Sequence, residues 1–208
     1  MFQRNSLFKI TLLMLFLLTI ASCTQKTVDD NTAGYISIDE NSSYQRTFDD
    51  LDIGEVFNYN FHWLKAKESW VSIWLEGYSN GQLIEPKSLG GMKYGLSPHK
   101  EENGKIGFGV INTNQEPLVF FYSNGTRVHP SKIQENILTN KGISTWEYGI
   151  DEGEVAIKYN EEIILAMYRQ NNNSIRSGYD YSDEEGIQAI IEGYETVLFL
   201  KIKIEKAN

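Results

Sequence analysis

The stretch SWVSIWLEGY, residues 69–78, decides the class of fold. Its aliphatic residues Val71, Ile73 and Leu75 alternate with polar or aromatic residues, and a period of two is the repeat of a β-strand with one buried face. Runs of similar β-branched and aromatic character recur at residues 105–112, 117–122, 154–159, 162–169 and 194–205. Together they predict an all-β domain, an antiparallel β-sandwich, with a small β-barrel as the alternative.

Helical periodicity is weak, so we expect at most one or two short helices. Residues 131–140, SKIQENILTN, follow Pro130 and are the best helical candidate, with room for two or three turns. Residues 182–193, SDEEGIQAIIEG, are ambiguous. Their acidic start resembles a helix N-terminus, whereas Gly186 weakens a helix.

Two similar segments, YSNGQLIEP at residues 78–86 and YSNGTRVHP at 122–130, predict two hairpins. The Asn-Gly pairs suit the two central positions of a type I′ turn, which require positive φ. Pro86 and Pro130 remove a backbone donor and are expected to end the second strand of each hairpin. The similarity has two readings, independent use of a common turn or an ancient duplication that placed equivalent hairpins in two facing sheets.

The N-terminus has the features of a cleaved targeting segment. Arg4 and Lys9 precede the apolar run Ile10–Ile20, which is little more than half the length of about 20 residues that a membrane-spanning helix needs. Ala21 and Ser22 then supply small residues before Cys23, the only cysteine of the chain.

The residues IASC at 20–23 resemble the lipobox of bacterial lipoproteins. The resemblance implies that the Cys23 sulfur receives a diacylglyceryl group and that cleavage occurs between Ser22 and Cys23. Two acyl chains make a stable anchor, where one chain does not. The alternatives are a secreted protein with a free thiol and an uncleaved N-terminal membrane anchor.

These features divide the chain into three parts: a signal peptide at residues 1–22, a lipidated Cys23 with a flexible tether at 23–47, and one β-rich domain at 48–208. The tether is inferred from a composition rich in Asp, Asn, Ser and Thr with no periodic apolar face. Cleavage would change the formal net charge from −9 to −11, because two basic and no acidic residues would be lost. So acidic a chain is a poor partner for nucleic acid.

The same stretch that decides the fold also contains the candidate binding site. Trp70, Trp74 and Tyr78 share the strand face opposite the aliphatic residues. An exposed row of rings suits stacking on sugars or contact with a hydrophobic peptide. The alternative is that another element covers these rings, since large aromatic side chains are mostly buried.

Catalytic and metal-binding patterns are weak. The three histidines His62, His99 and His129 are isolated in sequence, and none has a second ligand-type residue at a metal-binding spacing. We therefore expect no metal and no cofactor, and we name no catalytic residue.

The function expected from the sequence is that of a lipid-anchored lipoprotein on the extracytoplasmic face of the cell membrane, acting as a non-catalytic module for a cell-envelope glycan or protein. The alternatives are an extracytoplasmic hydrolase and a regulatory lipoprotein that contacts a membrane sensor. Beyond residue 48 the chain also resembles uncharacterised lipoproteins of Gram-positive bacteria, a resemblance that implies no activity.

Overall fold

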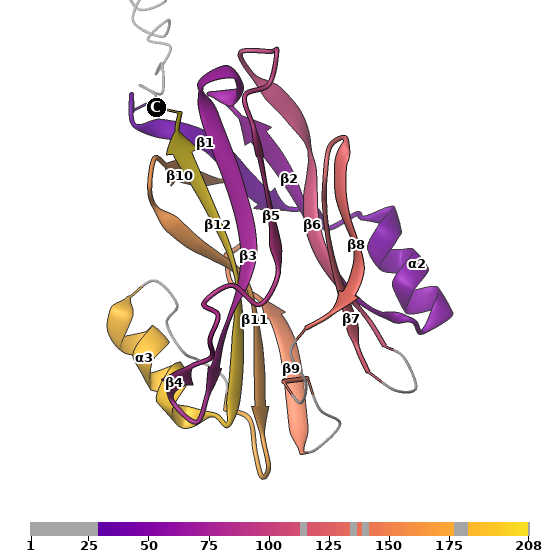
Figure 1. The fold of residues 1–208 in the computed structure, drawn as a ribbon. Helices are drawn as coiled ribbons and strands as arrows, with labels where there is room; N and C mark the ends of the chain where they lie inside the picture. Colours follow the sequence, from indigo (N-terminus) through magenta and orange to yellow (C-terminus); the bar gives the residue numbers. More distant parts are fainter. Residues whose placement is uncertain (1–28, 113–115, 134–136, 139–141, 177–182, 208) are drawn as a thin grey trace, which may run out of the picture.

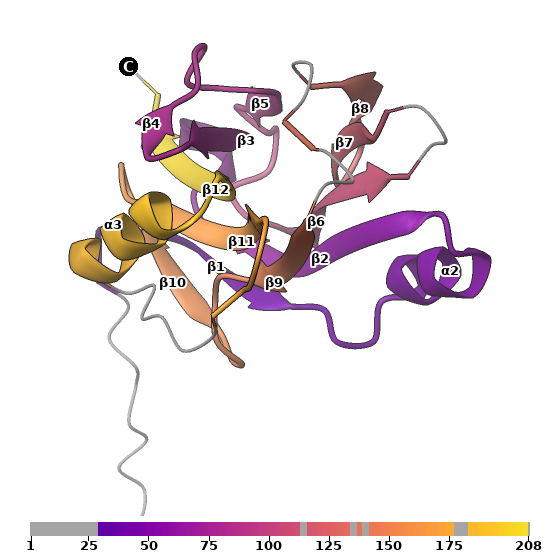
Figure 2. The ribbon, with the colours of Figure 1, turned by 90° about the horizontal axis from the view of Figure 1, so that it is seen from below.

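Two antiparallel β-sheets pack face to face in the computed structural model, which describes residues 29–112, 116–133, 137–138, 142–176 and 183–207 (Figure 1). This arrangement confirms the predicted β-sandwich, and the described strands do not close into the alternative barrel. Seen from below, α3 lies against the β11–β12 side and α2 lies beyond β2, so the two helices flank different sheets (Figure 2).

The first sheet, called sheet A, has the strand order β10-β1-β2-β6-β7-β8. Its strands are β10 (Val155–Lys158), β1 (Thr32–Ile38), β2 (Gly54–Trp63), β6 (Glu102–Ile111), β7 (Leu118–Ser123) and β8 (Thr126–Lys132). The second, sheet B, has the order β4-β3-β12-β11-β9, and β5 also pairs with β3. Its strands are β4 (Gln82–Leu83), β3 (Ser69–Ser79), β12 (Thr196–Lys206), β11 (Glu162–Asn171), β9 (Ile143–Tyr148) and β5 (Gly91–Gly95).

The core lies between the inner faces of the two sheets. Val71, Ile73 and Leu75 are fully buried there, as the alternation in β3 predicts. Across the sandwich, the hydroxyl of Tyr59 in β2 donates a 2.6 Å hydrogen bond to the backbone carbonyl of Leu165 in β11. This bond satisfies the phenol in an apolar interior and joins the two sheets.

Both predicted hairpins form, one in each sheet: β3 pairs with β4, and β7 pairs with β8. Asn80 and Gly81 both have positive φ, as a type I′ turn requires, whereas Gly125 alone does so in the second turn. The second hairpin also corrects a prediction, because Pro130 lies inside β8 and does not end it. β8 is an edge strand with a register shift opposite Val119–Phe121, and such a position tolerates a residue without an N–H donor.

The prediction of a flexible tether through residue 47 is wrong for its described part. β1 lies between β10 and β2, where Ala33 and Ile36 are buried in the core. Helix α2 (Ser43–Leu51) follows, and the Ser42 hydroxyl caps its N-terminus by accepting a 3.3 Å hydrogen bond from the Gln45 amide. The polar composition of the predicted tether gave no sign of this short strand, which is stabilised by pairing with β10 and β2.

The two helical expectations have opposite outcomes. Ser131 and Lys132 belong to β8, so the helix predicted over 131–140 is wrong at its start, and residues 134–136 and 139–141 lie outside the described part. The ambiguous segment forms α3 (Glu184–Gly193), capped by Asp183, whose carboxylate accepts a 2.6 Å hydrogen bond from the Gly186 amide. Neither helix, nor the short 3-10 turn Ala66–Glu68, is long and apolar enough to cross a membrane.

The position of β1 gives a test by substitution. Ile36→Ala should lower the free energy of unfolding by about 2–5 kcal/mol, because it removes buried methyl groups from the core. Exposed Glu40→Ala, a few residues further along, should change it by less than about 0.5 kcal/mol. Urea denaturation of the two variants measures the difference, and equal, negligible effects would mean that this segment is a tether.

Candidate functional site

The outer face of β3 carries the three aromatic residues that the sequence singles out. Trp70, Trp74 and Tyr78 all point away from the core and are half-buried. They do not form one uniform row. Tyr78 packs edge-on against Phe199, with 5.9 Å between ring centroids, and donates a 2.8 Å hydrogen bond to Glu76. Tyr78 packs against a second apolar cluster, which includes Ile190 of α3. The two tryptophans are therefore the open part of this face.

Two glycines of β5 make room for the tryptophans. Gly95 is paired with Trp70 and Gly91 with Trp74. A Cβ atom on Gly95 would lie 2.7 Å from Cε3 of the Trp70 indole, and one on Gly91 would lie 2.8 Å from the Trp74 Cβ. Real Cβ contacts are not this short, so only glycine allows Trp70 to lie across the neighbouring strand.

Charged side chains surround the tryptophans. The carboxylate of Glu205, opposite Trp70 on β12, pairs with Lys93 at 2.9 Å and with Lys203 at 3.5 Å. On β11, which is the other neighbour of β12, Glu162 lies directly opposite Lys203 in the strand register. A shallow depression of about 510 Å³ runs over Trp74 between these groups, lined chiefly by Ser72, Trp74, Lys93, Glu162, Lys203 and Glu205. We call Trp70, Trp74 and these flanking side chains the Trp platform.

A buried ion pair supports one end of the Trp platform. The side chain of Glu76, two residues after Trp74, is only 1 % exposed, and it accepts a 2.6 Å hydrogen bond from Lys201. Lys201 lies opposite Trp74 in the ladder, and Lys87 lies 3.3 Å from the second Glu76 oxygen. Burial alone would raise the pKa of Glu76, but the hydrogen bonds from Lys201 and Tyr78 and the two lysine charges outweigh it, so the pKa is lowered.

This arrangement is suited to binding a polar ligand with a flat apolar face. An indole offers a π-face for stacking, and the paired carboxylates and ammonium groups around it can exchange partners with ligand hydroxyls. The nearest deeply buried carboxylate, Glu76, is not part of the lining of the depression and is paired with Lys201 and Lys87. The geometry therefore fits recognition better than acid–base chemistry.

The histidines give little support to the hydrolase alternative. His62 Nε2 lies 3.7 Å from Glu101, with the two side chains 36 % and 49 % exposed, which describes a surface pair. His129 lines a different groove, on sheet A. Within the described residues there is no group of three or more His, Cys, Asp or Glu side chains that could hold a metal ion.

Sequence reasoning missed two components of the site. Buried Glu76 occupies an outward position in the alternation of β3, and the cations that pair with it are 11 and 125 residues away in the chain. The position of the β5 glycines, in contrast, could have been predicted from their spacing in the sequence. Gly91 and Gly95 have the same four-residue spacing as Trp70 and Trp74, and antiparallel pairing brings the two pairs together.

The buried ion pair gives a pH-dependent prediction. Glu76→Gln should lower the free energy of unfolding at neutral pH by about 3 kcal/mol, because it leaves Lys201 without its buried partner. Since the folded-state pKa of Glu76 is below the ordinary value of 4.5, its contribution is present above pH 4.5 and is lost as the pH falls through the lower value. The difference between wild type and variant should therefore shrink in acid.

The matched control is Glu205→Gln, which removes a carboxylate that is 35 % exposed from its pair with Lys93. Its cost should stay below about 1 kcal/mol. Denaturant titrations from pH 7 to pH 3 measure both variants, and a Glu76 effect that does not depend on pH would contradict the assigned ionisation.

Comparison with known proteins identifies one family. A family model described as the YgaN domain matches residues 40–204, which include α2, α3 and all the strands except β1 and the last residues of β12. No curated protein matches the chain, and no solved structure does. Because the match covers well over half of the sequence, the chain belongs to the YgaN domain family.

Proposed function

We propose that this protein is a lipid-anchored, extracytoplasmic binding module whose Trp platform recognises a cell-envelope glycan. The observation that carries the proposal is the position of Trp74, half-buried on the floor of a depression with ion-paired side chains around it. A sugar ring has apolar C–H faces and a rim of hydroxyl groups. It can stack on the indole while its hydroxyls bond to the lysines and carboxylates.

The anchor rests on the N-terminal sequence. The basic residues, the short apolar run and the IASC motif support lipidation of Cys23 and export across the membrane. Because β1 already begins at Thr32, a linker from Cys23 does not extend to residue 47 as the sequence predicts. From Cys23 to Asp29, six fully extended residues span at most about 20 Å. The folded domain would then remain close to the membrane and bind ligands there.

Binding is favoured over hydrolysis because the carboxylates of the Trp platform and the adjacent Glu76 are neutralised by nearby lysines. Glu76 is engaged by Lys201 and Lys87, Glu162 by Lys201, and Glu205 by Lys93 and Lys203. A general acid needs a raised pKa, whereas the pKa values of Glu76 and Glu205 are lowered. Burial would raise the pKa of Glu76, but its contacts with the lysines lower the pKa by more. The hydrogen bond from Lys93 is the main cause of the lowered pKa of Glu205.

Substitution of Trp74 tests the glycan site. In co-sedimentation of the full chain, purified in detergent, with isolated cell-wall glycan, Trp74→Ala should weaken binding at least tenfold, about 1.4 kcal/mol, because the stacking surface is removed. Trp74→Phe should retain part of the affinity. Tyr44→Ala, which truncates an aromatic ring on α2 beside the opposite sheet, is the matched control and should bind like wild type. Unchanged binding by a folded Trp74→Ala protein would exclude the Trp platform as the glycan site.

Lipidation is tested separately. Mass spectrometry of the membrane-bound protein should find a mature N-terminus at Cys23 that carries a diacylglyceryl group, because the lipobox cysteine is the acceptor. Cys23→Ser should remain uncleaved by the lipoprotein pathway and lose that modification. An unmodified Cys23, or the wild-type chain in the cytosol, would contradict the anchor without bearing on glycan binding.

A further inference from the structure

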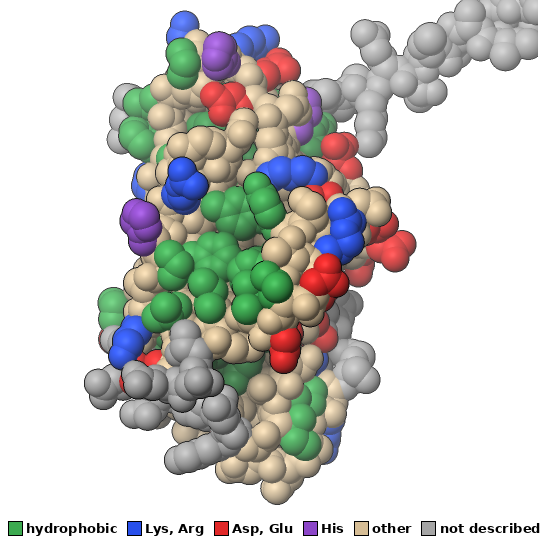
Figure 3. All heavy atoms as spheres, turned by 90° about the vertical axis from the view of Figure 1, so that its right-hand side faces the viewer, with side chains coloured by type: hydrophobic (Ala, Val, Ile, Leu, Met, Phe, Trp, Pro, Cys, Tyr) green, Lys and Arg blue, Asp and Glu red, His purple; other side chains and the backbone are tan. Residues whose placement is uncertain are grey.

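A second concave surface lies on the outer face of sheet A, between α2 and the β7–β8 hairpin. It has a volume of about 500 Å³. Figure 3 shows an apolar patch in the middle of this side of the molecule, with histidine and basic side chains near its margin. We call this surface the aromatic groove; its main lining residues are Tyr44, Phe48, Val56, Phe120, Tyr122, Arg127 and His129.

The floor of the aromatic groove is fixed by glycines of β6. Gly107 is paired with Tyr122 and Gly109 with Phe120. A Cβ atom at Gly107 would lie 2.3 Å from the Tyr122 hydroxyl, and one at Gly109 would lie 2.3 Å from the Phe120 ring. The two rings therefore lie over bare backbone and stack at 6.2 Å between centroids. Tyr122 is also held by a hydrogen bond to the buried Asn58 side chain.

Helix α2 forms one wall, with its apolar face only partly covered. Phe48 contacts Phe120 at 5.9 Å and Tyr44 contacts Tyr122 at 5.6 Å between ring centroids. None of the residues of α2 is buried, and Tyr44 remains 56 % exposed. One turn beyond Phe48, Leu51 extends the same face and is 62 % exposed. This is the pattern of an amphipathic helix that leaves room for another contact.

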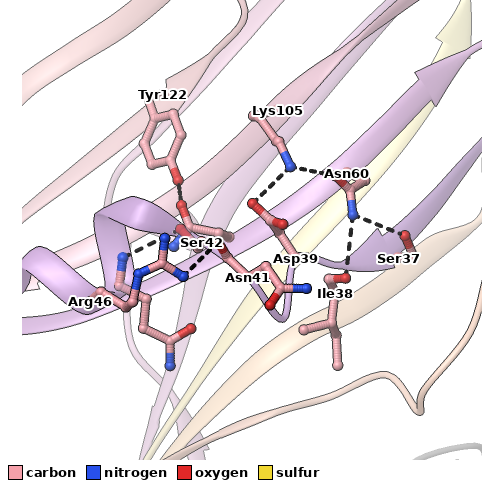
Figure 4. A network of polar contacts seen from close by, with 11 residues as sticks. Ser37, Ile38, Asp39, Asn41, Ser42, Arg46, Asn60, Lys105 and Tyr122 are labelled. Carbon is pink, nitrogen blue, oxygen red and sulfur yellow. Dashed lines mark hydrogen bonds and ion pairs between the residues drawn. The ribbon is translucent and has the colours of Figure 1, made fainter. Parts of the chain in front are cut away.

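A polar network at the start of α2 holds this wall in place (Figure 4). Lys105 of β6 pairs with Asp39 at 2.7 Å, and Asn60 of β2 donates a 3.4 Å hydrogen bond to the backbone carbonyl of Ile38. The Ser42 cap then sets the first turn of the helix. Because the corner before α2 is tied to two strands of sheet A, the wall is positioned before any ligand arrives.

The opposite wall is basic. Arg127 lies opposite Tyr122 in the ladder, and His129 follows two residues later on β8. Neither takes part in any ion pair formed between described residues. Within the part of the chain that the structure describes, no Asp or Glu lines this groove, although the sequence has 28 acidic and 19 basic residues. An apolar floor beside the Arg127 guanidinium is complementary to a ligand that is apolar on one side and anionic on the other.

From this complementarity we propose that the aromatic groove binds an acidic, aromatic peptide segment of a protein partner. An apolar side chain of the segment lies on Phe120 and Tyr122, and a carboxylate next to it pairs with Arg127. A peptide is favoured over the membrane surface because the site is a concave groove of about 500 Å³, which fits a single protruding segment better than the flat surface of a bilayer. This site is on the opposite sheet from the Trp platform and does not depend on glycan binding.

Selection from a random peptide library tests the proposal through the chemistry of the peptides that bind. The full chain, reconstituted in phosphatidylcholine nanodiscs, is the bait for a displayed library of random 12-residue peptides. We expect enrichment of peptides that combine Phe, Tyr, Trp or Leu with Asp or Glu. The affinity of a synthetic copy of the most enriched peptide should fall at least tenfold with Arg127→Glu and at least fivefold with Tyr44→Ala.

The matched control is Lys206→Glu, the same charge reversal at an exposed residue of sheet B, which should leave the peptide affinity unchanged. Thermal unfolding confirms that each variant is folded. Failure to enrich any peptide class, enrichment without acidic residues, or equal weakening by Lys206→Glu would overturn the proposal. It would also be overturned if Arg127→Glu reduced co-sedimentation with phosphatidylglycerol vesicles but left peptide affinity unchanged, since the groove would then be a lipid contact.

Discussion

The pairing of β3 with β12 is the constraint on which the other features depend. Eleven residue pairs, from Ser69 with Lys206 to Ser79 with Thr196, fix the register without interruption. The pairing puts Val71, Ile73 and Leu75 beside the inward aliphatic residues of β12, and on the other face it places Lys201 opposite Trp74. A shift of one residue would exchange the two faces, so the core and the Trp platform are specified by the same register.

Both sheets use one physical device on their outer faces, an aromatic ring laid over a glycine of the neighbouring strand. Gly95 of β5 accommodates Trp70, and Gly107 and Gly109 of β6 accommodate Tyr122 and Phe120. The rings are thereby half-covered and held, yet they still present one face outward. The surroundings then differ: paired lysines and carboxylates beside the tryptophans, and a basic strand with an apolar helix beside the other rings. The protein therefore presents two unlike aromatic surfaces, one on the outer face of each sheet.

The strands with long alternation could be predicted from the sequence, because a period of two over six or more residues has no helical equivalent. The strand β1 could not, since it is short, its Tyr35 and Ile38 are only half-buried, and its stability comes from β2 and β10. Similarly, the face of Trp70 and Trp74 was predictable, but the withdrawal of Tyr78 into the α3 cluster was not. It depends on Phe199, which is distant in sequence. Long-range contacts, not local propensity, set these features.

Hydroxyl-radical footprinting of the full chain, with and without isolated cell-wall glycan, tests whether the Trp platform binds glycan, because oxidation of tryptophan and tyrosine reports the exposure of the Trp platform and of the aromatic groove in one experiment. If the Trp platform binds glycan, the glycan should slow oxidation of Trp74 and Trp70 and leave oxidation of the exposed Tyr44 on α2 unchanged. Equal oxidation of Trp74 in the two conditions, or protection confined to Tyr44, would contradict it.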